Sequence, residues 1–333
     1  MREIITLDYG SGGLKTAQLI DEILRPAFAN TALDQLGDGA VLPQLDGAPV
    51  FSTDSFVVSP WKFPGGDIGK LAVCGTVNDV CMAGGVPEYL SFSLILEEGF
   101  ALDDLKAVVE SAAATARQAG VQIVTGDTKV VERGHGDGIY INTAGIGTLR
   151  APGLGRGSLR EGDAVLVSGS VGCHGAAILM ARGGLPCEGA LLSDCRPLHA
   201  LSAAALDTGG VRMLRDPTRG GVATTLNEFV EGGPLGIELE EAAIPVDAPV
   251  AAACDLLGLD PLYSACEGRM LVVCAPEKAG AVLDALHALP GGEGAVQIGR
   301  VTTARPGQVV LRTSLGGSRI LGKLTGAQLP RIC

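Results

Sequence analysis

The sequence is poor in aromatic residues and in positive charge. Aromatic residues make up 4% of 333, and 25 Lys and Arg stand against 37 Asp and Glu, which leaves a net charge of −12. Such a chain lacks the basic surface typical of general nucleic-acid binding. No apolar run reaches the roughly 18 to 20 residues of a membrane span, and no signal peptide is recognisable. We therefore expect a cytoplasmic protein that binds neither nucleic acid nor membrane.

Cysteine motifs for disulfides or structural metal are also missing. The nine cysteines are an odd number, and none follows the Cys-x-x-Cys spacing of a zinc site. Cys74 and Cys81 lie seven apart on one face of a predicted helix, which favours small core residues over metal ligands. The same interpretation applies to Cys254, Cys266 and Cys274, which lie in or beside apolar segments.

The standard nucleotide-binding and hydrolase motifs are absent as well. Residues 317–323 fit G-x-x-x-x-G-K, but Leu324 follows where a P-loop needs Ser or Thr for magnesium. The sequence contains neither G-x-G-x-x-G nor G-x-S-x-G. A P-loop, a dinucleotide-binding motif and an α/β-hydrolase elbow are therefore excluded.

What the sequence does contain is 49 glycines, a hydrophobic content of 47% and alternating strand and helix patterns, which predict two α+β or α/β domains. Residues 151–160 lack periodicity and separate a domain over 1–150 from one over 161–325. We expect a flexible Gly-rich segment at 1–13 and a mobile tail at 326–333. Predicted helices cover 14–25 (ended by Pro26), 68–80 (capped by Asp67), 103–119, 174–183, 197–207, 220–231, 247–257 and 276–288. Predicted strands cover 50–53, 89–96, 121–125, 139–147, 164–168, a segment ending at 214, 235–239 and 269–274, with short strands after them.

Aspartates set among small residues end several of these segments. They are Asp38, Asp54, Asp79, Asp127 and Asp216. An Asp beside Gly is most often a turn or a helix cap, but Asp79 lies within an apolar helix, where an unpaired carboxylate is costly to bury. Carboxylates that converge on one site need a cation, and Mg²⁺ binds such ligands together with phosphate oxygens. Lys129 and Arg219 are suitable phosphate contacts, and the glycines after Arg219 leave helix amides open to an anion.

These segments resemble the HypE family of hydrogenase maturation factors, the carbamoyl dehydratases, within the superfamily of aminoimidazole ribonucleotide synthetase and selenophosphate synthetase. The likeness runs almost from end to end, with one small departure at Cys81 to Gly84. It is carried by Asp8 to Gly13, Phe63 to Lys70, Asn78-Asp79-Val80, Gly126 to Val131, Asp216 to Thr225, Glu267-Gly268-Arg269 and Pro330-Arg331-Ile332-Cys333.

The resemblance implies an N-terminal α+β domain whose strands form a dimeric β-barrel, a C-terminal α/β domain, and ATP bound in a cleft between them. It makes Asp38, Asp79 and Asp216 look like magnesium ligands. Nucleotide or metal contacts are implied for Asp54, Gly126, Asp127 and Thr128, and Asn78 and Arg219 are further candidates for binding the nucleotide. The Gly-rich N-terminal segment is expected to close over the phosphates.

The implied reaction starts with a carbamoyl group delivered to the thiol of Cys333 by a HypF-like carbamoyltransferase. ATP-dependent dehydration then gives a thiocyanate, which supplies the cyanide ligand of the [NiFe]-hydrogenase iron through a HypC–HypD-type scaffold. Glu267 is our candidate base, and Lys129 either assists it or only contacts phosphate. We expect Arg331 to guide the tail towards the acidic site. The histidines are not expected to be catalytic, and His135 and His174 are predicted to face solvent in Gly-rich loops.

Three other functions are possible. A selenophosphate synthetase carries a reactive Cys or Sec in the N-terminal Gly-rich segment, and residues 10–13 contain none. An aminoimidazole ribonucleotide synthetase has no reason to end in a thiol. A non-catalytic maturation scaffold or metal chaperone would use the many thiols, but they lack metal-ligand spacing, and failure to bind ATP would favour it.

Overall fold

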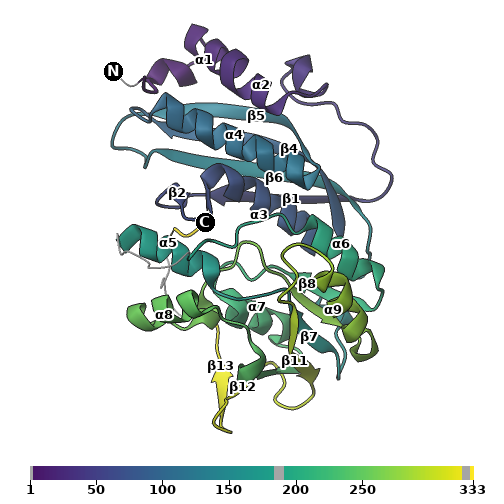
Figure 1. Ribbon diagram of the computed structural model, residues 1–333. Coiled ribbons are helices and arrows are strands. Elements are labelled where there is room, and N and C mark those ends of the chain that lie inside the picture. Colours follow the sequence, from purple (N-terminus) through teal and green to yellow (C-terminus); the bar gives the residue numbers. More distant parts are fainter. Residues whose placement is uncertain (1–2, 184–190, 325–330) are drawn as a thin grey trace.

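Two layered domains lie one above the other in a computed structural model of the protein, which describes residues 3–183, 191–324 and 331–333 (Figure 1). The N-terminal domain occupies the upper part of the view, and the C-terminal domain lies below it. The chain end comes to the boundary between them.

The N-terminal domain is built on a four-stranded sheet ordered β1-β6-β4-β5, in which only β4 and β5 pair in parallel. Helices α3 and α4 pack against this sheet and against each other. The predicted cap at Asp67 is confirmed, because its carboxylate accepts from the Gly69 and Lys70 amides. The elements are β1 Pro49–Phe56, β2 Lys62–Phe63, β3 Gly66–Asp67, α3 Ile68–Met82, β4 Gly85–Glu97, α4 Leu102–Ala119, β5 Gln122–Val131 and β6 Ile139–Leu149.

The first helical segment does not end at Pro26 as predicted. It continues as α1 Leu14–Leu19, the π-helical η2 Ile20–Leu24 and α2 Arg25–Phe28. Pro26 is tolerated because it lies at the start of α2, where a missing backbone N–H costs little. Within the segment expected to be flexible, Leu7–Gly10 forms the 3-10 helix η1.

Strand β5 extends further than the predicted 121–125 and carries Gly126 to Thr128 within it. A Cβ on Gly126 would lie 2.2 Å from the carbonyl oxygen of Phe92 on β4. Glycine is therefore required by the close approach of two paired strands. The glycine that we took as the end of the strand is what lets the parallel pair continue.

The C-terminal domain holds a seven-stranded sheet ordered β13-β12-β9-β11-β7-β10-β8. Only β9 and β12 pair in parallel, so the sheet is largely antiparallel, unlike the parallel sheet of an α/β domain. Its strands are β7 Ala164–Val167, β8 Val211–Arg215, β9 Gly236–Glu240, β10 Leu271–Cys274, β11 Val296–Thr302, β12 Val309–Arg312 and β13 Ser318–Leu321. Its helices are α5 Cys173–Gly183, α6 His199–Asp207, α7 Gly221–Val230, α8 Ala248–Leu257 and α9 Ala279–His287. Short 3-10 turns are η3 Leu33–Gln35, η4 Arg156–Ser158, η5 Glu241–Ala243, η6 Pro261–Tyr263 and η7 Pro276–Lys278.

The two domains are joined through the buried side chain of Asn78 on α3. Its amide nitrogen donates to the carbonyl of Arg196 (3.2 Å), and its amide oxygen accepts from the N–H of Leu198 (2.7 Å). Both polar ends are thus satisfied by the backbone that leads into α6. Asn78 thereby helps to hold residues 196–198 against the N-terminal domain.

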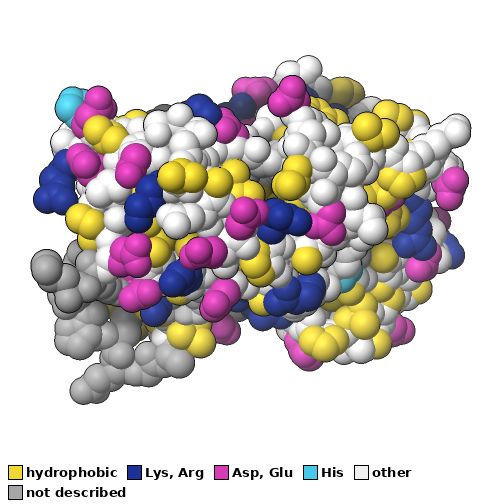
Figure 2. Space-filling model, turned by 90° about the horizontal axis from the view of Figure 1, so that it is seen from above, with side chains coloured by type: hydrophobic (Ala, Val, Ile, Leu, Met, Phe, Trp, Pro, Cys, Tyr) yellow, Lys and Arg dark blue, Asp and Glu magenta, His cyan; other side chains and the backbone are white. Residues whose placement is uncertain are grey.

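Most of the described cysteines lie in the core, and the surface carries charges of both signs. Acidic and basic side chains are interspersed on the face shown in Figure 2. Seven of the cysteines in the described part of the chain are buried, including the five predicted as core residues, and Cys333 is half-buried. Among the described residues, no helix is both long and apolar enough to cross a membrane.

Candidate functional site

A cavity of about 450 Å³ lies where the N-terminal sheet meets the C-terminal domain. It brings together five of the predicted site residues and the terminal cysteine. These are Asp54, Asp79, Asp216, Arg219, Glu267 and Cys333. Three of the six come from the N-terminal domain and the tail, so the site exists only because the two halves and the chain end meet here.

Asp79 faces the cavity from the middle of α3. Its carboxylate is mostly withdrawn from water and accepts a hydrogen bond from the Ser52 hydroxyl on β1, at 2.7 Å. Burial raises the pKa of Asp79, while the Ser52 hydrogen bond opposes the rise and the charge of Asp54 adds to it. The carboxylate of Asp79, which needed a polar partner in its apolar helix, thus finds one in a serine on the neighbouring strand.

Asp216 lies opposite Asp79, at the turn between β8 and α7. Burial, followed by the charge of Asp79, raises the pKa of Asp216 to about 7. The next turn needs glycine: Gly221 has φ +61°, and a Cβ there would lie 2.5 Å from the carbonyl oxygen of Leu262. The tight turn leaves Arg219 exposed at the cavity mouth, where it lies 3.9 Å from Asp54.

The acidic set suits a cation held jointly by protein and phosphate. In the described ranges, no three His, Cys, Asp or Glu side chains are already placed to hold a metal. Asp79 and Asp216 nevertheless face one cavity. The charge of Asp79 raises the pKa of Asp216, and the charge of Asp54 raises that of Asp79, a repulsion that a divalent cation would relieve. Mg²⁺ typically takes one or two carboxylates and completes its shell with phosphate oxygens and water. The two aspartates therefore fit a magnesium–nucleotide better than a metal cage made of protein alone.

Glu267 is buried at the inner end of the cavity. Its pKa is raised well above the usual range, first by burial and next by the nearby Cys195 thiol. The backbone is fixed by Asp194, whose two carboxylate oxygens accept from the amides of Glu267 (3.3 Å) and Gly268 (3.2 Å). Any Cβ on Gly268 would collide with the carbonyl of Asp194, at 1.9 Å.

The last three residues are docked at this cavity. They run antiparallel to residues 57–59: the Val57 amide donates to the Cys333 carbonyl (3.1 Å) and the Ser59 amide to that of Arg331 (3.2 Å). Burial, then the charge of Glu267, raises the pKa of the Cys333 thiol to about 12. The thiol therefore rests protonated beside the predicted base. Residues 326–330 of the predicted mobile tail lie outside the described residues.

One expectation near the tail is wrong and one stays a prediction. The guanidinium of Arg331 pairs with Asp137 (2.6 Å) and lies over the ring of Tyr140 in the docked tail, and its guiding role stays a prediction. His174 does not face solvent; it is fully buried in the first turn of α5 and bonds to the Ile332 carbonyl, at 2.6 Å. The glycines around His174 suggested a loop, whereas they allow close packing at the start of a helix. His135 is exposed as predicted.

The remaining predicted site residues lie elsewhere in the chain. A second groove, of about 330 Å³, runs between α1, α2 and β5 and is lined by Gly126, Asp127, Thr128 and Lys129. Lys129 pairs with Asp127 at 2.6 Å, and this hydrogen bond lowers the pKa of Asp127. Asp38 is exposed between two glycines that line the same groove. Within one chain, the structure does not bring Asp38 to Asp79 and Asp216.

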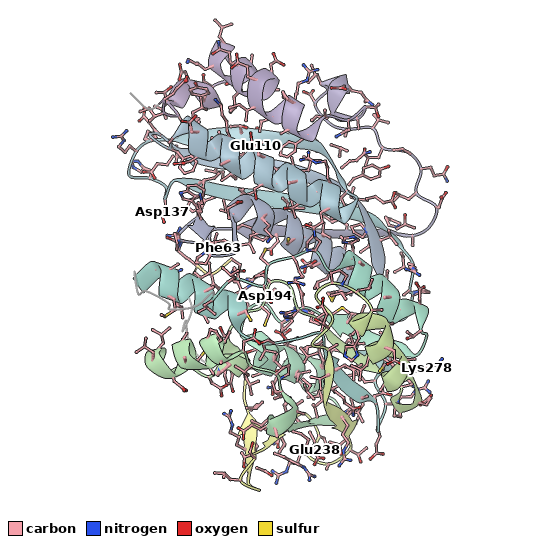
Figure 3. The ribbon with its side chains drawn as sticks, in the orientation of Figure 1. Phe63, Glu110, Asp137, Asp194, Glu238 and Lys278 are labelled. Atoms are coloured by element: carbon pink, nitrogen blue, oxygen red, sulfur yellow. The ribbon has the colours of Figure 1, made fainter. Side chains whose placement is uncertain are left out.

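Asn78 was predicted as a site residue but has a structural contact, whereas Asp194 was not predicted but supports the site. Asn78 was predicted to contact nucleotide, and in this structure its amide is fully used between the domains. Asp194 was not predicted, although it fixes the backbone of Glu267. It lies in a stretch without periodicity, so only the fold shows what it faces. Figure 3 labels Asp194 near the domain boundary, below Phe63.

The sequence matches two family models in tandem. These are "AIR synthase related protein, N-terminal domain" over residues 36–149 and "AIR synthase related protein, C-terminal domain" over residues 160–312. Residues 150–159 lie between the two matched ranges.

Relatives similar over their full length carry a more specific name. Carbamoyl dehydratase HypE of Azotobacter vinelandii is 51% identical over 332 residues, covering 99% of this chain and 97% of the relative. The enzyme of the same name from Escherichia coli K12 is 48% identical, with 99% of both chains covered.

Solved structures agree with this likeness. A crystal structure of hydrogenase maturation protein HypE in complex with ATP is 48% identical, has a TM-score of 0.95, and covers 98% of this chain and 99% of its own. A chain from a HypE–HypF complex is 43% identical with a TM-score of 0.80, covering 92% and 99%. A thiamine-monophosphate kinase from Stenotrophomonas maltophilia, 20% identical with a TM-score of 0.68, covers 96% of this chain and 100% of its own and shares the fold alone.

Proposed function

This chain belongs to the HypE family of carbamoyl dehydratases, and we propose that it uses ATP to convert a carbamoyl group on the Cys333 thiol into a thiocyanate. The observation that carries the proposal is the position of Cys333. Its thiol shares one cavity with Glu267 and with the acidic pair Asp79 and Asp216. A thiol, a base and a cation-binding set are the groups that this reaction requires.

The chemistry begins with a poor leaving group. Dehydration of S–C(=O)NH₂ would expel hydroxide, so the carboxamide oxygen first takes the γ-phosphoryl group of ATP, releasing ADP. One nitrogen proton is lost as the oxygen is phosphorylated, and the second is removed as the C–O bond breaks and phosphate leaves, so that S–C≡N remains. Overall, the carbamoyl group and ATP give thiocyanate, ADP and phosphate. Positioning and charge neutralisation provide most of the catalysis in phosphoryl transfer.

In this proposal Glu267 removes the protons from nitrogen. It is buried beside the thiol that would carry the carboxamide, and its raised pKa makes its ionised form a stronger base than an exposed carboxylate. Lys129 lies in the second groove with Asp127, so it supports a phosphate contact rather than proton transfer at Cys333. Mg²⁺ bound at Asp79 and Asp216 would neutralise phosphate charge.

Nucleotide contacts by Asp54, Arg219 and the residues 126–128 remain part of the proposal. They line two separate cavities of one chain, and Asp38 borders the second. The resemblance implies a homodimer with a shared barrel, and the N-terminal sheet offers a face for it. Phe51 on β1 is 65% exposed opposite Ile146, and Ile95 on β4 is 44% exposed opposite Tyr140. Such an apolar sheet face favours association with a second copy.

The proposed partners follow from the chemistry and from the relatives. A HypF-like carbamoyltransferase would load Cys333, as suggested by the related chain solved in a HypE–HypF complex. A HypC–HypD-type scaffold would accept the cyanide. In the described part of the tail, Cys333 lines the cavity, and both steps would proceed by movement of the chain end.

The decisive experiment is mass spectrometry of the C-terminal peptide after incubation with a carbamoyl donor, the carbamoyltransferase and Mg·ATP. We expect the mass of a carbamoyl group on Cys333, and then a loss of one water that requires ATP. Cys333→Ala should block both products while retaining ATP binding. Cys254→Ala, which changes a buried internal cysteine, is the matched control and should leave both products. Carbamoyl found on an internal cysteine, or water loss without ATP, would refute the proposal.

A further inference from the structure

His174 is a buried polar side chain that the proposed chemistry does not use. It is completely inaccessible and lies in the first turn of α5, with the ring of Phe63 edge-on to it at 5.4 Å. Its Nε2 lies 2.6 Å from the carbonyl oxygen of Ile332, and its Nδ1 lies 2.7 Å from the hydroxyl of Ser193. A buried histidine with two short polar contacts, one of them to the chain end, calls for an explanation.

The hydrogen-bond partners of His174 determine which of its ring nitrogens carries the proton. A carbonyl oxygen can only accept, so Nε2 must carry hydrogen and donate to Ile332. Burial lowers the pKa of His174, so the ring is neutral and Nδ1 accepts from the Ser193 hydroxyl. The Ser193 oxygen accepts in turn from the amide of Cys195, at 3.1 Å. The relay therefore runs in one direction, from Cys195 through Ser193 and His174 to the Ile332 carbonyl.

The segment that contains Ser193 also fixes the backbone of Glu267. Ser193 is adjacent to Asp194, whose carboxylate accepts from the Glu267 amide. The N-terminal domain fixes the same segment from the other side, because the Ser193 amide donates to the Pro64 carbonyl at 2.8 Å. Two adjacent residues thus position the base and the tail. Asp194 fixes the backbone of Glu267, and Ser193 orients the histidine that contacts the tail.

We propose that His174, oriented by Ser193, is a positioning residue that latches the Ile332 carbonyl and so holds the Cys333 thiol beside Glu267. The latch acts on the backbone one residue before the thiol and leaves the thiol itself free to carry a group. Arg182 assists from the same helix by donating to the Arg331 carbonyl at 2.8 Å. The assignment of a tail latch follows from the contacts alone; only its effect on dehydration rests on the proposed function.

Release of the tail can be measured without carbamoyl chemistry, by the rate at which a maleimide labels Cys333. His174→Phe keeps an aromatic ring against Phe63 and removes both hydrogen bonds. Loss of a buried hydrogen bond that leaves a carbonyl unpaired should accelerate labelling about 5- to 100-fold. Ser193→Ala, which removes only the orienting hydroxyl, should accelerate it less, and His174→Gln, which can still donate to the carbonyl, should remain nearest to wild type.

Control variants distinguish specific release of the tail from a general loss of folding stability. His287→Phe removes a comparable hydrogen bond, from a ring nitrogen to the Ala295 carbonyl at 2.8 Å, and should leave Cys333 labelling unchanged. The buried internal cysteines report folding, since their labelling must stay slow in every variant. Cys333 labelling within twofold of wild type in His174→Phe would overturn the proposal. If that variant exposes internal cysteines, Ser193→Ala decides, and an unchanged rate there overturns it equally.

A second measurement tests the consequence for the reaction. In a single-turnover assay on protein already carbamoylated at Cys333, His174→Phe should slow water loss about 5- to 100-fold, while loading by the carbamoyltransferase stays at least as fast. Equal slowing of loading and of water loss would contradict positioning. If labelling accelerates but no variant, wild type included, forms thiocyanate, the latch stands and the proposed function fails.

Discussion

Replacing Asp216 by Asn should stabilise the protein in the absence of divalent cations. Burial and the charge of Asp79 raise the Asp216 pKa from 3.8 to about 7. The folded state therefore binds this proton more tightly than the unfolded state, and the free energy of unfolding falls as pH rises from about 4 to about 7. Above that range the carboxylate destabilises the fold by on the order of 4 kcal/mol, taking about 1.4 kcal/mol for each pH unit.

The assay is urea unfolding with a metal chelator at pH 5 and pH 8. Asp216→Asn should gain about 2 to 3 kcal/mol more at pH 8 than at pH 5, because most of the charge penalty appears between these values. Asp46→Asn, at an exposed carboxylate, is the matched control and should show no such difference. Adding Mg·ATP at pH 8 should stabilise wild type more than the variant. An equal gain at both pH values, or a loss at pH 8, would refute the reasoning.

Three further outcomes are expected. Asn78→Ala should lower the free energy of unfolding by about 2 to 4 kcal/mol in urea titrations, because it leaves a buried carbonyl and a buried amide unpaired; an unchanged midpoint would contradict this. Glu267→Gln should retain ATP binding and carbamoyl loading but slow water loss by about 10² to 10⁴, and an unaltered rate in single-turnover mass spectrometry would remove its role as base. Gly126→Ala should cost about 1 to 3 kcal/mol in thermal unfolding because of the Phe92 carbonyl, whereas Gly39→Ala, with open space around it, should be neutral; similar losses in both would argue against the strand contact.

The sequence indicated most helices and strands, since hydrophobic periodicity follows directly from which face is buried. It misplaced features that depend on contacts between distant segments. Strand β5 continues through Gly126 because a glycine permits the close approach of β4, and the first helical segment continues through a π-helical turn, Ile20–Leu24, into α2, which contains Pro26. Neither packing against β4 nor a π-turn leaves a periodic signal.

The site was predicted in the same uneven way. Asp79 stood out because a carboxylate in an apolar helix needs a reason, and it does lie in the cavity with Asp216 and Glu267. His174 was misjudged because neighbouring glycines suggest a loop as readily as a tightly packed helix start. Nothing in the local pattern links His174 to residue 332, and a hydrogen bond across 158 positions can be seen only in the folded chain.

The side-chain amide of Asn78, which links α3 to the backbone before α6, has a consequence for how the reaction rate depends on protein concentration. Opening the two halves would break these buried hydrogen bonds, which favours movement of the chain end over movement of the domains. In the proposed reaction, a group carried on that end would meet the cavity as a tethered reactant, at an effective concentration set by tail length and not by protein concentration. Each chain would then process its own thiol in a first-order step, unaffected by dilution, while loading and unloading by separate proteins would slow as the mixture is diluted.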